Sequence, residues 1–391
     1  MTDFLQRAKE LEQEMIARRR DFHKHPELGF QEIRTSGIVA KELNRLGLEV
    51  RTGVGKTGVV GLLEGDKPGP TILLRFDMDA LPIVEANQTD YISENSGVMH
   101  ACGHDGHTTI GLAVAKMLMP LRKEIAGTIK FVFQPAEEGL GGALAMVKDD
   151  VMNSPKVDRS LALHLWNDKP FGWVAATNGP CMAAADKFTI TLQGKGGHGA
   201  APYLAHDPII ASAQIITALQ TVVSRNINAL DSAVLSMTSV KGGEAFNVIP
   251  DSVVMLGTVR TFTSEVRDRV MKRFEEIVIG LAKVMECEAK IEYHTTTAAV
   301  LNDAAMSAEV RELAKAMPGV TTVTDSERTM GSEDMAYMMQ TVPGCYFFIG
   351  SANAEKGLNF PHHHPRFDFD ERALAQGAAL MAQAAARYVL K

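Results

Sequence analysis

The chain has few cysteines, no long apolar segment and no basic run, and each absence excludes a class of protein. The 391 residues include only four cysteines, which are far apart and form no Cys-x-x-Cys pair: Cys102, Cys181, Cys287 and Cys345. Such spacing is atypical of a disulfide framework and favours a reducing, cytoplasmic location. No run of about 18 apolar residues suggests a membrane span. We therefore expect a cytoplasmic protein that does not enter the membrane.

The net charge and the amino-terminal sequence argue against a nucleic-acid-binding protein and against a secreted one. The formal net charge is −7 and the basic residues are scattered, so a broad nucleic-acid surface is not expected. Residues 2–22 predict a charged amphipathic helix, which lacks the apolar core and cleavage site of a signal peptide. Hydrophobic residues make up 46% and charged residues 22%, as in ordinary globular proteins. The length exceeds that at which one core usually stops growing, so we expect two domains.

The middle of the chain predicts a domain of its own. From about position 185 the hydrophobic pattern indicates strands and helices in the order βαββαβ, which is the ferredoxin-like signature. The expected elements are strand 187–193, helix 208–224, strands 233–240 and 251–261, helix 265–285 and strand 289–295. We therefore assign residues 1–184 and 298–391 to one α/β domain and residues 185–297 to an inserted domain.

In the first domain, several expected strands are followed by residues with reactive side chains. Asp77 and Asp79 follow the strand predicted at 71–75, and Glu137 and Glu138 follow the strand predicted at 127–133. His164 lies near the end of a further strand. Because open α/β sheets bind ligands at the carboxyl ends of their strands, this pattern indicates a functional site.

Residues 100–107 hold three histidines, a cysteine and an aspartate, with glycines between them. We expect them in a loop that enters a helix over about 108–121. Sulfur and nitrogen donors suit a divalent transition metal, most simply zinc. An ordinary histidine-rich helix entry is the alternative. His164 and the run 362–364 are further candidate ligands, although the first could be a core histidine and the second a solvated loop.

The adjacent acids Glu137 and Glu138 could have two different roles at a metal site. One carboxylate could bind a metal while its neighbour accepts a proton from bound water and passes it to a leaving amine. A solvated acidic loop is the alternative interpretation.

Seven motifs together resemble, nearly end to end, the dinuclear-metal amidohydrolases that include hippurate hydrolases, bacterial aminoacylases and plant indoleacetyl-amino-acid hydrolases. The motifs are FDMDALP at 76–82, HACGHDGH at 100–107, QPAEE at 134–138, HLW at 164–166, GKGGHGAAP at 194–202, NVIPD at 247–251 and HHPRF at 363–367. Phe76 stands where the family usually has a small residue, and we expect this to alter packing but not chemistry. The resemblance implies a zinc-exopeptidase-like catalytic domain, with a mixed sheet between helices, and an inserted lid and dimerisation domain.

The resemblance also implies the roles of individual residues. Two divalent ions (zinc, manganese, cobalt or nickel) would share Cys102, and four further ligands would complete their shells: His104, Glu138, His164 and His363. His363 is preferred to His362 and His364 because it precedes Pro365 by two, as the family's ligand precedes its proline. Glu137 would be the general base, and Asp79 would orient a ligand near the bridge. His198 would reach the active site of the partner subunit in a homodimer, and Asn247 and Arg260 would hold the substrate's carboxylate.

The implied reaction is hydrolysis of the amide bond of an N-acyl amino acid by metal-activated water. A metallocarboxypeptidase or dipeptidase acting on short peptides is the nearest alternative, since it needs the same site. A hydrolase with Cys102 as nucleophile and His104 as base would survive metal removal but not alkylation. A non-catalytic metal-binding dimer would have no need of Glu137.

Overall fold

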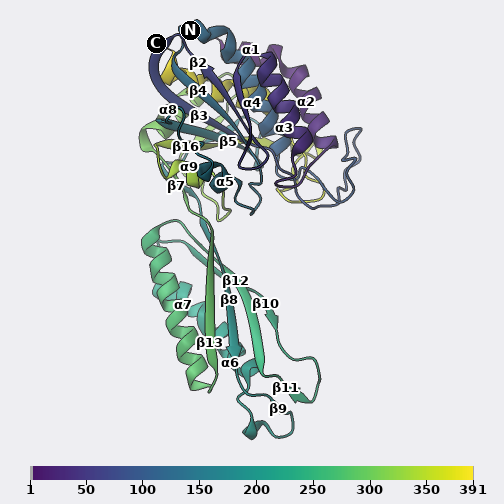
Figure 1. The fold of residues 1–391 in the computed structure, drawn as a ribbon, viewed down its shortest axis with the longest axis vertical. Helices are drawn as coiled ribbons and strands as arrows, with labels where there is room; N and C mark the ends of the chain where they lie inside the picture. The colour runs from purple at the N-terminus through teal and green to yellow at the C-terminus, as the bar shows by residue number, and fades with distance from the viewer. Residues whose placement is uncertain (1–2, 391) are drawn as a thin grey trace. The chain divides into compact units, whose positions relative to one another are not determined.

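The computed structural model describes residues 3–390, which divide into two compact units (Figure 1). Unit 1 consists of Met1–Cys181, Val300–Arg328 and Asp334–Lys391, and unit 2 of Met182–Ala299 with Thr329–Glu333. The expected inserted domain, 185–297, falls within unit 2. No sequence pattern predicts the second, short segment of unit 2 at 329–333.

Unit 1 is built on a mixed sheet of eight strands in the order β1-β2-β4-β3-β5-β16-β6-β15. The strands are β1 (Glu49–Val54), β2 (Gly58–Glu64), β3 (Lys67–Asp77), β4 (Ala126–Gln134), β5 (Arg159–Pro170), β6 (Trp173–Ala175), β15 (Thr322–Thr324) and β16 (Gly344–Ala352). The four central strands, β4, β3, β5 and β16, run parallel. Their apolar runs are buried almost throughout, as expected of parallel strands covered on both faces. β7 (Gly179–Met182) and β14 (Val300–Asn302) form a separate two-stranded sheet.

Helices cover this sheet, and α4 and α10 pack against each other and against its strands. The helices of unit 1 are α1 (Phe4–Glu10), α2 (Glu12–Lys24), α3 (Ile33–Arg45), α4 (His104–Leu118), α5 (Gly142–Lys148), α8 (Ala304–Ala316), α9 (Ala336–Met339) and α10 (Arg372–Val389), with 3-10 turns η1 (Met119–Glu124) and η3 (Ala354–Lys356). In Figure 1, α1, α2 and α3 lie on the same flank as α4. The covered core joins sheet residues such as Phe131 and Phe347 to helix residues such as Val114 and Leu380.

Two expected helices have different limits in the structure. The helix expected over 108–121 begins at His104, because Gly103 takes a left-handed φ of 89° and ends the preceding loop there. It stops at Leu118, and a 3-10 turn containing Pro120 follows. The single helix expected over 2–22 is interrupted at Leu11, which separates α1 from α2; position 2 lies outside the described residues.

Unit 2 contains an antiparallel sheet in the order β10-β12-β8-β13, with two helices packed on it, as the βαββαβ pattern predicts. Its elements are β8 (Ala184–Gln193), β9 (Gly197–His198), η2 (Pro202–Leu204), α6 (Pro208–Asn226), β10 (Ala233–Lys241), β11 (Val248–Ile249), β12 (Ser252–Thr261), α7 (Ser264–Val284) and β13 (Glu288–Thr297). Along β12 buried and less buried residues alternate, which places Val253, Met255 and Val259 in the core. Asp207 and Thr263 cap the two helices. That this unit acts as a lid and dimerisation domain stays a prediction.

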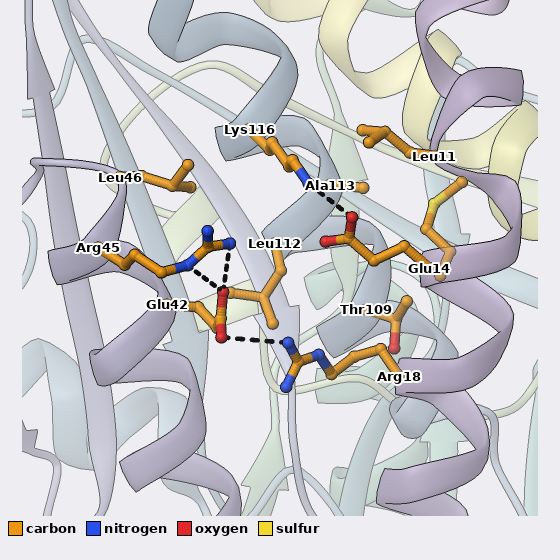
Figure 2. A pocket seen from close by; sticks show the side chains of 11 residues that line it. Leu11, Glu14, Arg18, Glu42, Arg45, Leu46, Thr109, Leu112, Ala113 and Lys116 are labelled. Atoms are coloured by element: carbon orange, nitrogen blue, oxygen red, sulfur yellow. Dashed lines mark hydrogen bonds and ion pairs between the residues drawn. The ribbon is translucent and has the colours of Figure 1, made fainter.

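One surface pocket lies apart from the predicted site residues. Figure 2 shows a pocket between α2, α3 and α4 in which Glu42 pairs with Arg18 and Arg45, and Lys116 pairs with Glu14. Because its cations already have acidic partners, this pocket does not present a free charge to a ligand.

Within residues 3–390, none of the helices has the length and apolar character that a membrane crossing requires.

Candidate metal centre

Strand register brings the predicted site residues of unit 1 to one level of the sheet. Asp77, at the end of β3, pairs with Gln134 at the end of β4. Arg75 pairs with Ala162 of β5, so His164, two residues further on, lies level with Asp77. Glu137 and Glu138 leave the sheet three and four residues after Gln134. The parallel pairing therefore gathers residues that are distant in sequence.

The start of α4 adds a thiol and an imidazole to this level. Cys102 Sγ lies 3.5 Å from His164 Nε2. His164 Nδ1 donates to the carbonyl of Leu165 at 2.7 Å, which leaves Nε2 with its lone pair toward the thiol. Nδ1 of His104 donates to the backbone oxygen of Asp79 at 3.0 Å. These second hydrogen bonds fix the ring orientations, as partners of metal-bound histidines commonly do.

The donor atoms form two groups that share Cys102. In each group all donor atoms lie within 4.8 Å of one another; the groups are Cys102, His104 and His164, and Cys102, Glu138 and His363. A third such group contains His104, Glu137 and Glu138. The structure thus brings together all five ligands and the base that the resemblance implies.

Geometry distinguishes the three consecutive histidines. His363 Nε2 lies 3.2 Å from Glu138 Oε1, and its amide donates to the carbonyl of Ala101 at 2.8 Å. His362 Nε2 instead accepts the amide of Asn167 at 3.1 Å, and His364 stacks on Phe360. Only the middle histidine of the run therefore joins the donor groups described here.

Asp79 holds two neighbours of the candidate site in place. Its Oδ2 accepts the amide of Glu138 at 3.0 Å, and its Oδ1 lies 3.3 Å from His104 Nδ1. Through these contacts a single buried carboxylate orients an imidazole and the turn that carries Glu138. This arrangement fits the orienting role that the resemblance implies for Asp79.

The pKa values reflect donors packed closely in a buried space. Burial would lower the pKa of His104, but the nearby Asp77 and Cys102 raise it well above its usual value. Hydrogen bonds with Cys102 and Glu138 raise the pKa of His363 to about 10. Burial lowers the pKa of His164.

These residues fit divalent cations. His104 Nε2 is buried and makes no hydrogen bond within residues 3–390, although it belongs to the group with Cys102 and His164. An unsatisfied buried nitrogen is costly unless it has a partner. Thiol, imidazole and carboxylate donors are together typical of zinc and related metals.

A buried network around Asp77 supports the centre, and it includes Arg75 and Asp334, which the sequence analysis did not single out. Arg75, which is 1% exposed, donates to Asp77 Oδ2 at 2.6 Å. Asp77 Oδ1 accepts from His107 Nδ1 at 2.6 Å, and His107 Nε2 accepts the amide of Leu165 at 2.9 Å. Asp334 Oδ1 lies 3.3 Å from the other terminal nitrogen of Arg75, Nη2. Both nitrogens of His107 are therefore engaged in hydrogen bonds that join β3 to β5. The sequence did hold one sign of this network: Arg75 is a charged residue inside an apolar strand, two residues before Asp77.

The three predicted site residues of unit 2, which are His198, Asn247 and Arg260, do not all lie close together. His198 pairs with Val248 in the β9–β11 hairpin, and the amide of Gly199 donates to the carbonyl of Asn247 at 2.8 Å. Arg260 lies near the other end of β12, roughly 26 Å from Ser252 at about 3.3 Å per residue, and donates to Ser332 Oγ at 2.8 Å. The structure thus brings His198 and Asn247 together but not Arg260.

Comparison with known proteins identifies the family. The model for peptidase family M20/M25/M40 matches residues 73–387, most of the chain. The chain belongs to peptidase family M20. It is therefore a metal-dependent hydrolase, and its mixed α/β fold is that of M20 enzymes.

M20 relatives align over nearly the whole chain. Thermostable carboxypeptidase 2 of Saccharolobus solfataricus is 40% identical, covering 97% of this chain and 96% of the relative. N-acetyl-L-cysteine deacetylase of Bacillus subtilis is 38% identical, covering 96% and 88%. Among solved structures, a Bacillus subtilis protein described as a dinuclear metal binding peptidase of the M20 family has a TM-score of 0.85 and 34% identity, covering 96% of this chain and 98% of the other.

Proposed function

We propose that this chain hydrolyses the amide bond of N-acyl amino acids that carry a free carboxylate, with Glu137 as the general base. The observation that carries the proposal is that Cys102 belongs to two donor groups, while Glu137 lies in a third with His104 and Glu138. A base beside a two-ion site suits hydrolysis by water. A relative named IAA-amino acid hydrolase ILR1-like 4, from Arabidopsis thaliana, is 38% identical over 96% of this chain and 86% of its own length, and it supports the substrate class.

Five residues would hold the two divalent ions: Cys102 between them, with His104, Glu138, His164 and His363. A thiolate ligand favours zinc, cobalt or nickel over magnesium, and the oxygen and nitrogen donors also admit manganese. Bound there, such ions lower the pKa of water and polarise a carbonyl oxygen.

Glu137 then carries the proton through the reaction. Its carboxylate accepts a proton from the attacking water as the oxygen bonds to the acyl carbon. As the carbon–nitrogen bond breaks, the same carboxyl group delivers that proton to the departing amine. Asp79 keeps the ring of His104 and the amide of Glu138 in place during both steps.

Unit 2 would complete the site in a homodimer. The amide of Ala200 donates to His198 Nδ1 at 3.0 Å, so in the neutral ring Nε2 carries the hydrogen and can donate to a carbonyl oxygen. His198 and Asn247 are too far from Arg260 within one chain to bind the same small substrate. We therefore assign Arg260 of one chain and His198 and Asn247 of its partner to one substrate.

Short peptides are a second candidate substrate. Two carboxypeptidases of Saccharolobus solfataricus, 40% and 39% identical to this chain, favour it. A peptide with a free carboxylate presents the same amide next to the same charged group, so only the group on the acyl side differs.

A reconstituted assay tests the proposal. The metal-free protein is loaded with zinc, manganese, cobalt or nickel and tested on N-acetyl and N-benzoyl amino acids, on dipeptides and on the same compounds with amidated carboxylates. We expect hydrolysis of acyl amino acids, loss of activity on chelation, and strong discrimination against the amidated forms. Faster hydrolysis of the dipeptides would select the carboxypeptidase function, and no hydrolysis of any compound would refute both. Activity that survives chelation but not alkylation would instead identify Cys102 as a nucleophile.

A further inference from the structure

Glu32 is a buried carboxylate that the proposed reaction does not use. It lies at the start of α3, and its exposed fraction is 0%. One carboxylate oxygen, Oε1, accepts the backbone amide of Ala136 at 2.8 Å. The other, Oε2, accepts the hydroxyl of Thr57. A buried acid is costly unless such partners satisfy it, so this position has a specific structural task.

That task concerns the turn that carries Glu137. Ala136 has a φ of 53°, in the left-handed region that residues other than glycine rarely adopt. Its amide is held by Glu32, and its carbonyl accepts the amide of Gly142 at 3.0 Å. An unfavourable backbone conformation persists only where the surroundings impose it. These two hydrogen bonds impose it here, one residue before the proposed base.

The segment before α3 fits closely against the same turn. A Cβ at Gly29 would lie 3.0 Å from Cα and Cβ of Ala136, which is tighter than ordinary van der Waals contact, so glycine favours this close approach. The carbonyl of Glu27 accepts the amide of Ala80 at 2.8 Å, next to Asp79. Residues 27–32 thus contact the turns that follow both β3 and β4.

We propose that Glu32 is a positioning residue for Glu137. Its carboxylate holds the Ala136 amide so that the turn directs the Glu137 side chain, and it does not itself touch the substrate. This inference rests on the proposed function, because it assumes that Glu137 is the base. Glu138 depends less on Glu32, since Asp79 separately binds its amide.

Three variants of Glu32, compared with one control variant, test whether this residue positions Glu137 or only stabilises the fold. Glu32→Ala removes the partner of Ala136, and we expect kcat to fall about 100-fold, the effect of a displacement of about 1 Å in a catalytic group. KM should change less than about twofold, and two ions per chain should remain bound. Glu32→Gln should restore most of the kcat, because its amide oxygen can accept from Ala136 while its NH2 donates to Thr57. Glu32→Asp keeps the charge but is one methylene shorter, so we expect it to lose kcat even if the alanine variant does not fold.

Thr57→Val is the matched control. It removes the other partner of the same carboxylate and should lower the thermal midpoint, yet it leaves the bond to Ala136 and therefore the kcat. Hydrogen exchange at the Ala136 amide gives a readout that needs no substrate: it should accelerate in Glu32→Ala and not in Thr57→Val.

Several results would overturn the inference. These are wild-type kcat in folded Glu32→Ala or Glu32→Asp, an equal loss of kcat in Thr57→Val, a glutamine variant as slow as the alanine variant, or unchanged exchange at Ala136. If the wild-type protein hydrolyses none of the test compounds, the proposed function fails, whereas the exchange measurement still decides whether Glu32 holds the turn. An active wild type with an unaffected Glu32→Ala variant refutes only the role of Glu32.

Discussion

The interiors of the two units differ in kind. Unit 1 buries charged side chains next to its apolar core, including Arg19, Arg75, Asp77, Asp105 and Lys130. The core of unit 2 is a cluster of apolar residues around Phe188 and Phe274. Its buried acid Asp186 is paired with Arg267, which reaches solvent. The interior of unit 1 thus contains buried charged groups beside its apolar core, whereas the interior of unit 2 is mainly apolar.

The buried charges of unit 1 lie where orientation matters. Burying an ion pair seldom adds net stability, because desolvation offsets the attraction. Arg75 and Asp77 nevertheless fix His107, and through it the strand that carries His164. In unit 2, His198, the proposed donor to the substrate carbonyl, is exposed, and among residues 3–390 it has no such buried charged network around it. The buried pair of Arg75 and Asp77 thus supports the candidate metal centre.

Replacement of the proposed base should have the largest effect. Glu137→Gln removes the proton acceptor while keeping size and polarity, so we expect kcat to fall about 10²- to 10⁴-fold. Metal content and the thermal midpoint should stay close to wild type. Steady-state kinetics with metal analysis checks this, and near wild-type turnover would show that another group is the base.

The next largest effect should be on stability, and it compares the loss of a buried arginine in unit 1 with the loss of a partly exposed one in unit 2. Arg75→Met leaves Asp77 buried without its guanidinium partner, and we expect a loss of about 3–5 kcal/mol in the free energy of unfolding. Arg267→Met, in unit 2, should cost less, about 1 kcal/mol, because this arginine is partly exposed and the buried Asp186 keeps its hydrogen bond from Thr295. Urea denaturation measures both. Equal losses would contradict the contrast between the two units.

His198→Ala should reduce kcat by about 10²- to 10³-fold without altering stability, because it removes an exposed donor to the developing oxyanion. His294→Ala, an exposed histidine on β13, is the matched control and should have no effect. Mixing Glu137→Gln subunits with His198→Ala subunits should recover part of the activity if the donor acts across a dimer. Absence of any recovery in confirmed mixed dimers would place His198 at the active site of its own chain.

The smallest effect concerns acid sensitivity in unit 1. Burial raises the pKa of Asp370, but hydrogen bonds from Arg372 and Asn353 outweigh burial and lower it to about 2. A lowered pKa stabilises the fold above about pH 4, and this contribution is lost as the pH falls toward 2. Asp370→Asn should therefore cost about 1 kcal/mol at neutral pH and almost nothing near pH 2. Thermal midpoints against pH, with exposed Asp66→Asn as control, measure it; an unchanged pH profile would contradict this assignment.

Much of the fold was predictable because it follows from local patterns. Period-two alternation identified the strands of unit 2, and apolar runs identified β2, β3, β4 and β5. The contact partners of buried polar residues were not predictable in this way. Neither Glu32 nor Asp334 lies in a distinctive motif, and the hydrogen bonds that join them to Ala136 and Gln134 span 104 and 200 residues of sequence.

The sequence by itself determined the family, the set of candidate donors and the βαββαβ order, because motif chemistry and hydrophobic period are local properties. Tertiary structure alone decided that His104 begins a helix and that both nitrogens of His107 are engaged. It also places His363, which the spacing to Pro365 had favoured, beside Cys102 and Glu138. It also decided that Arg260 lies far from His198. These outcomes depend on strand register and on packing between distant segments, which exist only once the chain has folded.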